Sequence, residues 1–248
     1  IARRQRQMCI RDSTHHHELI QSPNNLLGLS YLKAIKQLAP HIKAMTIKRE
    51  GSHHHHSEIQ HHTFASGTSI RQSLTNGDNE WKRVVPESAH ALYQKPHALI
   101  EDTFPLIKYQ LTIQDADSLA SIYTVNEGFE NRLKSMVQVS HSHRELMENL
   151  KTKRYTYTHI QRILMNVLMN ISGQDVSKEI NAVRILSMND TGRNYLKYLK
   201  NKFPYRHFIT NLNKKNAHYF HNEIKATNVY NLISSQSQTD FNTPIICK

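Results

Sequence analysis

The residues best suited to chemistry stand at the start of one short helix, in the segment FASGTSIRQSL. Ser66, Thr68 and Ser69 place hydroxyl groups at this helix start, and Gly67 lets the backbone approach a ligand closely. The amides of a helix N-terminus attract anions, and the guanidinium fork of Arg71 suits a phosphate group. An ordinary capped helix would use the same residue types, so the spacing allows both a phosphate site and a plain cap.

Two further segments could supply polar groups to a nucleotide. Asn24 and Asn25 lie in the first turn of a helix predicted from Pro23, where their amides can cap the helix or read a base edge. Arg49 follows a short strand predicted at 44–48, and ligands gather at strand carboxyl ends in open α/β sheets. Plain helix capping and a solvated loop arginine explain these residues equally well.

Cations and aromatic rings alternate in the segment LKTKRYTYTHIQRI, a mixture that suits phosphate contacts and base stacking. Its candidate RNA-contacting residues are Lys151, Lys153, Arg154, Tyr155, Tyr157 and Arg162. A second basic stretch contains Lys197, Lys200, Lys202, Arg206, Lys214 and Lys215. The whole chain carries a net charge of +12 with a pI near 9.7, which favours polyanionic partners. A solvated basic face is the alternative for both stretches.

Histidine runs at 15–17, 53–56 and 61–62 invite a metal hypothesis, which the sequence does not favour. Adjacent histidines hold no fixed coordination geometry, and no Cys, Asp or Glu completes a set, so we expect no metal site. Cys9 and Cys247 stand near opposite ends and build no disulfide framework, which fits a reducing cytoplasm. The sequence has no apolar run long enough for a membrane span.

The elements expected around these residues are mostly helices. Helical spacing runs from Pro23 to Pro40, and almost everything from Trp81 onward reads as successive short helices. Pro105 requires its helix to begin at or after Thr103, or to kink there. A turn is expected at Gly77-Asp78, and short strands are expected at 44–48 and 182–188. A polar tail is expected after Ser234. The predicted fold is mainly α with a small α/β part, divided into 14–78, 79–235 and a tail at 236–248.

The order of these motifs resembles one known family. SPNNLLGLSYLKAI, TIKREG, FASGTSIRQSL, YTVNEGFENRL and LKTKRYTYTHIQRIL follow one another as in the bacterial tRNA(Met) cytidine acetate ligases of the nucleotidyltransferase superfamily. The resemblance covers most of residues 20–233. It implies a Rossmann-like catalytic domain that uses ATP, with Mg2+, to activate acetate as acetyl-adenylate. It further implies acetylation of the N4 amine of the wobble cytidine in elongator tRNA(Met).

The resemblance also assigns roles to individual residues. It implies that Asn24 lies near the adenylate and that Arg49 contacts the nucleotide. The helix start that faces the phosphates is carried by Ser66, Thr68, Ser69 and Arg71. His55 falls where the family has a Tyr-His-Asp loop, although histidines flank it here. The segment from Lys151 to Tyr155 would lie along the tRNA.

One departure from the family is larger than any substitution. The family has strands and a His-x-Gly-His loop before the Pro-Asn-Asn helix, and this sequence contains no His-x-Gly-His. That motif stabilises charge on the transferring phosphate, so its absence removes most of the electrostatic catalysis. The sequence therefore predicts a C-terminal part of such a ligase, inactive by itself, whose incomplete Rossmann-like remnant exposes apolar surface.

The first residues offer a reason for this departure. RRQRQMCIRDS, residues 3–13, back-translates in one frame to a sequencing adapter that ends ATGTGTATAAGAGACAG, so residues 1–13 are expected to be non-native. Without residues 3–13 the net charge is +9, and the chain is still basic.

Two other functions stay open on the sequence. One is another nucleotidyltransferase, acting on a small phosphorylated substrate, which would share the helix start at Ser66 but would not need the KTKRYTYT segment. The other is a non-catalytic RNA-binding helical protein, whose intact gene would lack His-x-Gly-His. Sequencing the genomic locus upstream of Thr14 distinguishes a truncated ligase from this second alternative.

Overall fold

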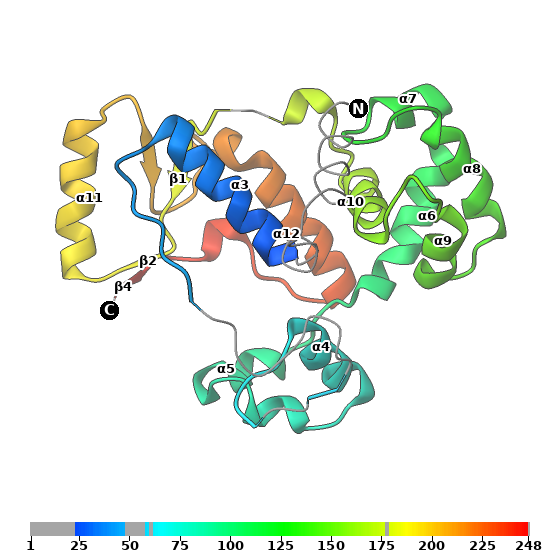
Figure 1. Ribbon diagram of the computed structural model, residues 1–248, viewed down its shortest axis with the longest axis horizontal. Coiled ribbons are helices and arrows are strands. Elements are labelled where there is room, and N and C mark those ends of the chain that lie inside the picture. Colours follow the sequence, from blue (N-terminus) through cyan, green and yellow to red (C-terminus); the bar gives the residue numbers. More distant parts are fainter. Residues whose placement is uncertain (1–22, 48–57, 60–61, 177–178, 248) are drawn as a thin grey trace, which may run out of the picture. The chain divides into compact units, whose positions relative to one another are not determined.

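The structure is a computed structural model that describes residues 23–47, 58–59, 62–176 and 179–247. The chain divides into two compact units, residues 1–87 and residues 88–248. Helices dominate the described residues, and the strands among them are short (Figure 1). The mainly helical character predicted from the sequence is confirmed.

The N-terminal unit contains α3 (Pro23–Leu38), α4 (Gly67–Asn76) and the 3-10 helix η1 (Glu80–Arg83). Helix α3 begins at Pro23, as predicted, because proline suits the first helical turn. It ends before Pro40, which cannot continue a helix. Helix α4 ends at Gly77, whose φ of 73° lies in the left-handed region that closes many helix C-termini. Both helices and the turn after α4 are therefore confirmed.

The residues after α3 correct the prediction. Residues 44–47 form no strand, and Met45 and Ile47 are 92% and 97% exposed. A strand needs a neighbour to satisfy its backbone polar groups, and the described part of the N-terminal unit contains no strand at all. The strand expected at 44–48 is therefore wrong for residues 44–47, the part of it that the structure describes. The described strands belong to the C-terminal unit.

Helix α3 exposes much of its apolar surface. Leu27, Leu29 and Leu32 are each about half exposed, and Leu38 is 83% exposed. Several exposed large apolar side chains on one helix are typical of an element that contacts another element or another protein. The exposed apolar surface expected for this segment is present.

A run of short helices opens the C-terminal unit. Helix α5 (Glu87–Tyr93) spans the division between the units, and the run continues with η2 (Ile100–Thr103), α6 (Phe104–Ile113), α7 (Ala116–Ser121), α8 (Phe129–Val139), α9 (His143–Leu150), α10 (Tyr157–Leu168) and η3 (Gly173–Asp175). Helix α6 begins at Phe104, so Pro105 stands in its first turn as its ring requires. The helices from α5 to α10 each fall within a segment predicted to be helical.

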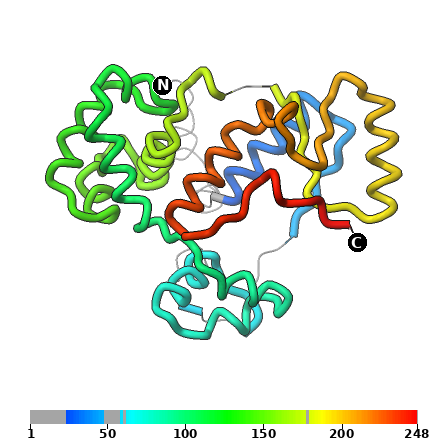
Figure 2. Tube along the Cα trace, turned by 180° about the vertical axis from the view of Figure 1, so that it is seen from behind, coloured from blue at the N-terminus to red at the C-terminus, as the bar shows by residue number. Residues whose placement is uncertain are grey.

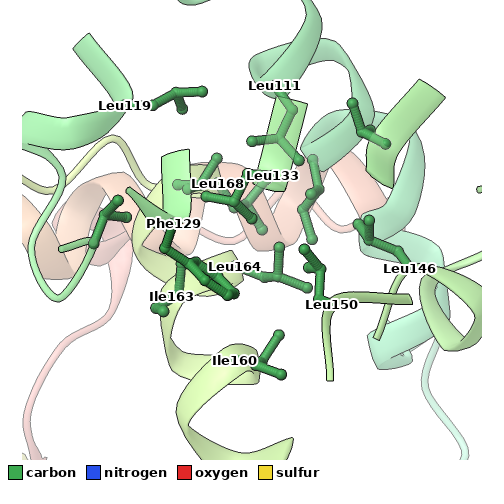
Figure 3. Packing of buried hydrophobic residues seen from close by; sticks show 14 of the residues in the cluster. Leu111, Leu119, Phe129, Leu133, Leu146, Leu150, Ile160, Ile163, Leu164 and Leu168 are labelled. Atoms are coloured by element: carbon green, nitrogen blue, oxygen red, sulfur yellow. The ribbon is translucent and has the colours of Figure 1, made fainter. Parts of the chain in front are cut away.

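One hydrophobic core joins helices α6 to α10 (Figure 3). Leu111 of α6, Leu133 of α8 and Leu164 of α10 are all completely buried within it. The apolar residues of each helix recur every three or four positions, so each short helix buries one face against the others. The core is thus built from helices that are too short to be stable alone.

Several cations of this unit bind the C-terminal ends of helices. Lys134 of α8 donates through Nζ to three backbone oxygens at the end of α6, at distances of 2.6 to 3.3 Å. Arg132 reaches two carbonyls at the end of α9, and Lys225 donates to the Met169 carbonyl after α10 at 2.9 Å. The last carbonyls of a helix have no partner within it, so these cations satisfy them and oppose the helix dipole. Part of the positive charge is therefore structural.

The rest of the unit carries two parallel strand pairs. Strand β1 (Ala182–Arg184) pairs with β3 (His207–Ile209), and β2 (Ser187–Met188) pairs with β4 (Ile246–Cys247). The remaining helices are α11 (Asp190–Lys202), η4 (Ala217–Phe220), α12 (His221–Ser234) and η5 (Asp240–Asn242). The strand predicted over 182–188 is confirmed as two short strands.

The residues after Ser234 belong to the C-terminal unit, although the sequence predicts a polar tail there. Asp240 forms a salt bridge with Arg184 of β1, and β4 pairs with β2. Figure 2 shows this last segment returning along α12 toward the strands. No helix in the described ranges is long and apolar enough to cross a membrane.

Candidate nucleotide and RNA sites

Two of the predicted hydroxyl groups cap helix α4. Ser66 Oγ accepts a hydrogen bond from the Ser69 amide at 3.0 Å, and Ser69 Oγ donates to the Ser66 carbonyl at 2.9 Å. These side chains are only 5% and 2% exposed. The two serines therefore build the helix start, and the exposed groups beside them are the ones placed to meet a ligand.

Arg71 folds back over the first turn of α4. Its Nη2 donates to Thr68 Oγ1 at 3.4 Å, and a Cβ added to Gly67 would lie 3.3 Å from its Nη1. Thr68 and Arg71 are both exposed. A guanidinium, a hydroxyl and a bare backbone at one helix N-terminus form an arrangement suited to an anion. Gly67 matters here because any side chain would press against the guanidinium.

The electrostatics around α4 favour its N-terminal turn over its flank for phosphate. A cavity of about 580 Å³ runs along one face of α4, and Glu58, Asp78 and Glu80 line it. Ser73 of α4 donates to the Asp78 carboxylate there. Carboxylates repel phosphate, whereas the N-terminal turn offers a positive dipole end and Arg71. A polyphosphate is therefore better accommodated at the helix start.

The two other nucleotide candidates stand on different segments. Asn24 and Asn25 are exposed in the first turn of α3, as their position in the sequence predicts. Arg49 lies outside the described residues, as does the loop with His55. Their contact with the same nucleotide as Arg71 is part of the proposal made below.

The candidate RNA-contacting cations differ in whether they already interact with other groups of the protein. Lys151 donates to the Thr152 carbonyl at 2.6 Å, and its Nζ lies 5.6 Å from the centre of the Tyr157 ring. Arg154 forms a salt bridge with Glu127, which offsets much of its charge. The two remaining cations, Lys153 and Arg162, are exposed, and neither forms an ion pair with any described residue. These two have the most charge available for phosphate.

Tyr155 does not have the base-stacking role that the sequence suggests. It is 8% exposed, its hydroxyl donates to Asn126, and its ring lies 4.4 Å from the Phe129 ring, centre to centre. A ring that is buried to this extent, with one face against another ring, offers no free face to a base. Tyr155 instead anchors the loop that carries Lys151 and Lys153, so its inclusion among RNA-contacting residues is corrected.

His143 is a buried titratable residue that the sequence analysis missed. It is 5% exposed, and its Nδ1 lies 4.0 Å from a carboxylate oxygen of Glu101, beside a cavity of about 560 Å³. Burial lowers the pKa of His143, and the Glu101 carboxylate opposes that change. Burial therefore favours the neutral form of the ring. Its position at the start of α9, after Ser142, reads in the sequence as an ordinary helix-start residue.

Within the described ranges no three His, Cys, Asp or Glu side chains are grouped to hold a metal ion. The histidine runs at 15–17 and 53–56 lie outside those ranges.

A phosphate-suited helix start followed by a helical unit matches one known class of protein. The model of the HIGH nucleotidyl transferase family matches residues 2–243, and the chain belongs to this family. The matched range begins within the segment 1–13, whose origin in an adapter is still a prediction.

Named relatives make the comparison more specific. The chain is 64% identical over 233 residues to the tRNA(Met) cytidine acetate ligase of Staphylococcus epidermidis ATCC 12228, covering 94% of this chain and 62% of that protein. It is 57% identical over 237 residues to the protein of the same name from Staphylococcus aureus MRSA252, covering 96% and 62%. The predicted resemblance is therefore confirmed, and the chain spans about 62% of the length of these relatives.

Solved structures share the fold. Thermotoga maritima TmcAL in its apo form superposes with a TM-score of 0.78 at 21% identity, covering 92% of this chain and 61% of that one. TmcAL from the same organism bound with alpha-thio ATP gives 0.77 at 20% identity, covering 98% and 64%. At these identities the likeness concerns the fold.

Proposed function

We propose that this chain is part of an enzyme that acetylates the N4 amine of the wobble cytidine in elongator tRNA(Met). The observation that carries the proposal is the 64% identity, across 94% of the chain, to a protein named tRNA(Met) cytidine acetate ligase. A structural neighbour with the same fold holds alpha-thio ATP, which supports ATP as the nucleotide. ATP and tRNA are cytoplasmic, and we place the enzyme there.

In the proposed reaction a carboxylate oxygen of acetate attacks the α-phosphate of ATP, and pyrophosphate leaves. The cytidine N4 then attacks the acetyl carbonyl carbon of the acetyl-adenylate, AMP leaves, and the nitrogen gives up one of its two protons to solvent. Thr68 and Arg71, with the N-terminal end of α4, would hold phosphate oxygens, and Mg2+ would offset the remaining negative charge. Asn24 and Arg49 would contact the nucleotide beside them.

The helical unit would hold the tRNA. Lys153 is an exposed cation in the loop before α10, Arg162 is an exposed cation within α10, and Lys151 precedes them in the same stretch of sequence. Contacts from such cations to phosphates position a nucleic acid without reading its sequence. The proposed division of labour is a nucleotidyltransferase part within residues 14–78 and a tRNA-binding part within 79–235.

A polypeptide of this sequence is expected to show no acetate-dependent exchange between ATP and pyrophosphate. The reason is chemical: the sequence contains no His-x-Gly-His to stabilise charge on the transferring phosphate. Incorporation of labelled pyrophosphate into ATP, with and without acetate, measures this directly. Robust acetate-dependent exchange by the 248-residue chain would show that other residues supply the catalysis.

Replacing Lys151 and Lys153 with alanine is expected to weaken tRNA binding by the full chain. Each lost phosphate contact should lower the slope of log K against log salt by about one. Fluorescence anisotropy of labelled tRNA(Met) at several salt concentrations gives both the affinity and the slope. A matched variant, Lys43→Ala with Lys95→Ala, makes the same change of charge at two exposed positions elsewhere. Equal weakening by both variants would mean that only net charge matters, and no weakening would favour a small phosphorylated substrate.

A further inference from the structure

Positive charge is concentrated in the segment 190–215. This segment, about a tenth of the chain, contains Arg193, Lys197, Lys200, Lys202, Arg206, Lys214 and Lys215. Asp190 is its single acidic residue, so its net charge of +6 is half of the +12 of the whole chain. A field of one sign over a small area attracts a polyanion.

Two of these cations are engaged within the protein: Arg193 pairs with Asp190, and Arg206 donates to the Ile180 carbonyl, which does not neutralise its charge. Lys134 and Arg132, among the core helices, donate hydrogen bonds to carbonyls at helix C-termini. In contrast, Lys197 and Lys200 on α11 are exposed, and neither forms a salt bridge or hydrogen bond with any residue in the described ranges. Their charge is available to a partner.

Tyrosine rings accompany the cations on one face of α11. Tyr195 and Tyr198 are 60% and 52% exposed, and their rings lie 6.1 Å apart at an angle of 21°. Lys202 Nζ follows at 5.4 Å from the Tyr198 ring centre. Beyond the helix, Arg206 lies 5.7 Å from the ring of Tyr205, which is 68% exposed. We call these five residues the α11 surface.

The exposure of these rings does not come from a loosely packed helix. Leu196 is 8% exposed on the opposite face of the helix, and α11 lies close to β2 and β3. Helical spacing puts positions 195, 198 and 202 on one side, away from Leu196. The sequence thus supplies apolar residues for packing and still leaves two tyrosines outside.

We propose that the α11 surface binds unpaired nucleotides of RNA, as a second contact region separate from Lys151 and Lys153. Nearly parallel exposed rings offer faces on which bases stack, and neighbouring cations meet the phosphates between them. This inference rests on the proposed function in that tRNA would be the RNA bound. The large apolar side chains exposed on residues 190–215 are tyrosines alone. Tyrosine also occurs at membrane interfaces, but an interfacial helix additionally buries Leu, Phe or Trp among the acyl chains, and this segment exposes none of them, so RNA fits better.

The test uses the full chain and a fluorescein-labelled, single-stranded 12-nucleotide oligocytidylate. Replacing both Tyr195 and Tyr198 with alanine is expected to weaken its binding by roughly tenfold or more, since stacked bases are lost. Replacing both with phenylalanine should retain the binding, because the ring faces remain. Both positions are exposed, so thermal unfolding should be unchanged in each variant.

The outcomes separate this inference from the proposed function. Weakening by the alanine pair, restored by phenylalanine, supports the α11 surface even if the chain shows no preference for tRNA(Met). Oligocytidylate binding that is equal in all variants overturns the inference, regardless of how the alanine replacements at Lys151 and Lys153 affect tRNA binding. Binding to phosphatidylglycerol vesicles that depends on the tyrosines, with RNA binding unchanged, overturns it in favour of a membrane surface.

Discussion

Replacing Leu164 with alanine is expected to lower the free energy of unfolding of the C-terminal unit by about 2 to 5 kcal/mol. Leu164 lies on α10 and is completely buried in the cluster that joins α6 to α10. The change removes transfer energy and leaves a cavity, and short helices around it have little independent stability to compensate. Urea unfolding followed by circular dichroism measures the difference.

The matched control is the same substitution at Leu232 of α12, which is 74% exposed. Its effect should be within about 0.5 kcal/mol, because an exposed leucine buries little on folding. A small effect at Leu164, comparable to that at Leu232, would contradict a single core shared by these helices.

Signals that act within a few residues allowed the helices to be predicted. Pro23 and Pro105 stand in first turns, and Gly77 closes α4, because backbone geometry at these positions is local. The strand expected at 44–48 failed for a different reason. A strand depends on a partner elsewhere in the chain, and TIK has the composition of a strand whether or not one is present.

The candidate sites show the same division. The phosphate-suited start of α4 could be found from FASGTSIR, because capping and the position of Arg71 one turn on are local. Composition could not show that the hydroxyl groups of Ser66 and Ser69 form hydrogen bonds between these two residues. Composition also could not show that Tyr155 is buried, because a segment of alternating cations and aromatics reads the same whether its aromatic rings are exposed or packed into the core. Burial depends on contacts such as the one with Phe129.

Net charge is a sum that hides how each cation is used. Lys134 and Arg132 serve helix C-termini, Arg154 is paired with Glu127, and Lys197 is exposed. All of them contribute equally to the +12. The sequence therefore indicates a polyanionic partner, and only the structure indicates which faces could meet it.

The second large effect is expected at the salt bridge that holds the last segment of the chain. Asp240 and Arg184 are only 11% and 18% exposed, and they join the segment after α12 to strand β1. Replacing Asp240 with asparagine leaves the guanidinium of Arg184 largely desolvated without its carboxylate. Breaking such a pair should cost about 2 to 3 kcal/mol, somewhat less than for a fully buried pair. Urea unfolding at pH 7 tests this value.

The same substitution on an exposed pair is the control. Asp190 is 88% exposed and lies 3.4 Å from Arg193, and exposed pairs of this kind contribute about 0 to 1 kcal/mol. Asp190→Asn should therefore have little effect. Equal losses in the two asparagine variants would mean that the Arg184–Asp240 pair does not hold the segment.

The pH dependence of stability is a second, independent test of the Arg184–Asp240 salt bridge. Burial would raise the pKa of Asp240, but hydrogen bonds from Thr227 and Arg184, with the charge of Arg184, lower it below 3.8. A carboxyl whose pKa is lowered on folding adds stability above its unfolded pKa, and this stability is lost as the pH falls through the folded value. The difference in unfolding free energy between the wild-type chain and Asp240→Asn should thus decrease only below pH 3.8. An advantage that is constant from pH 7 to pH 2 would show that the asparagine acts through packing and not through the lost charge.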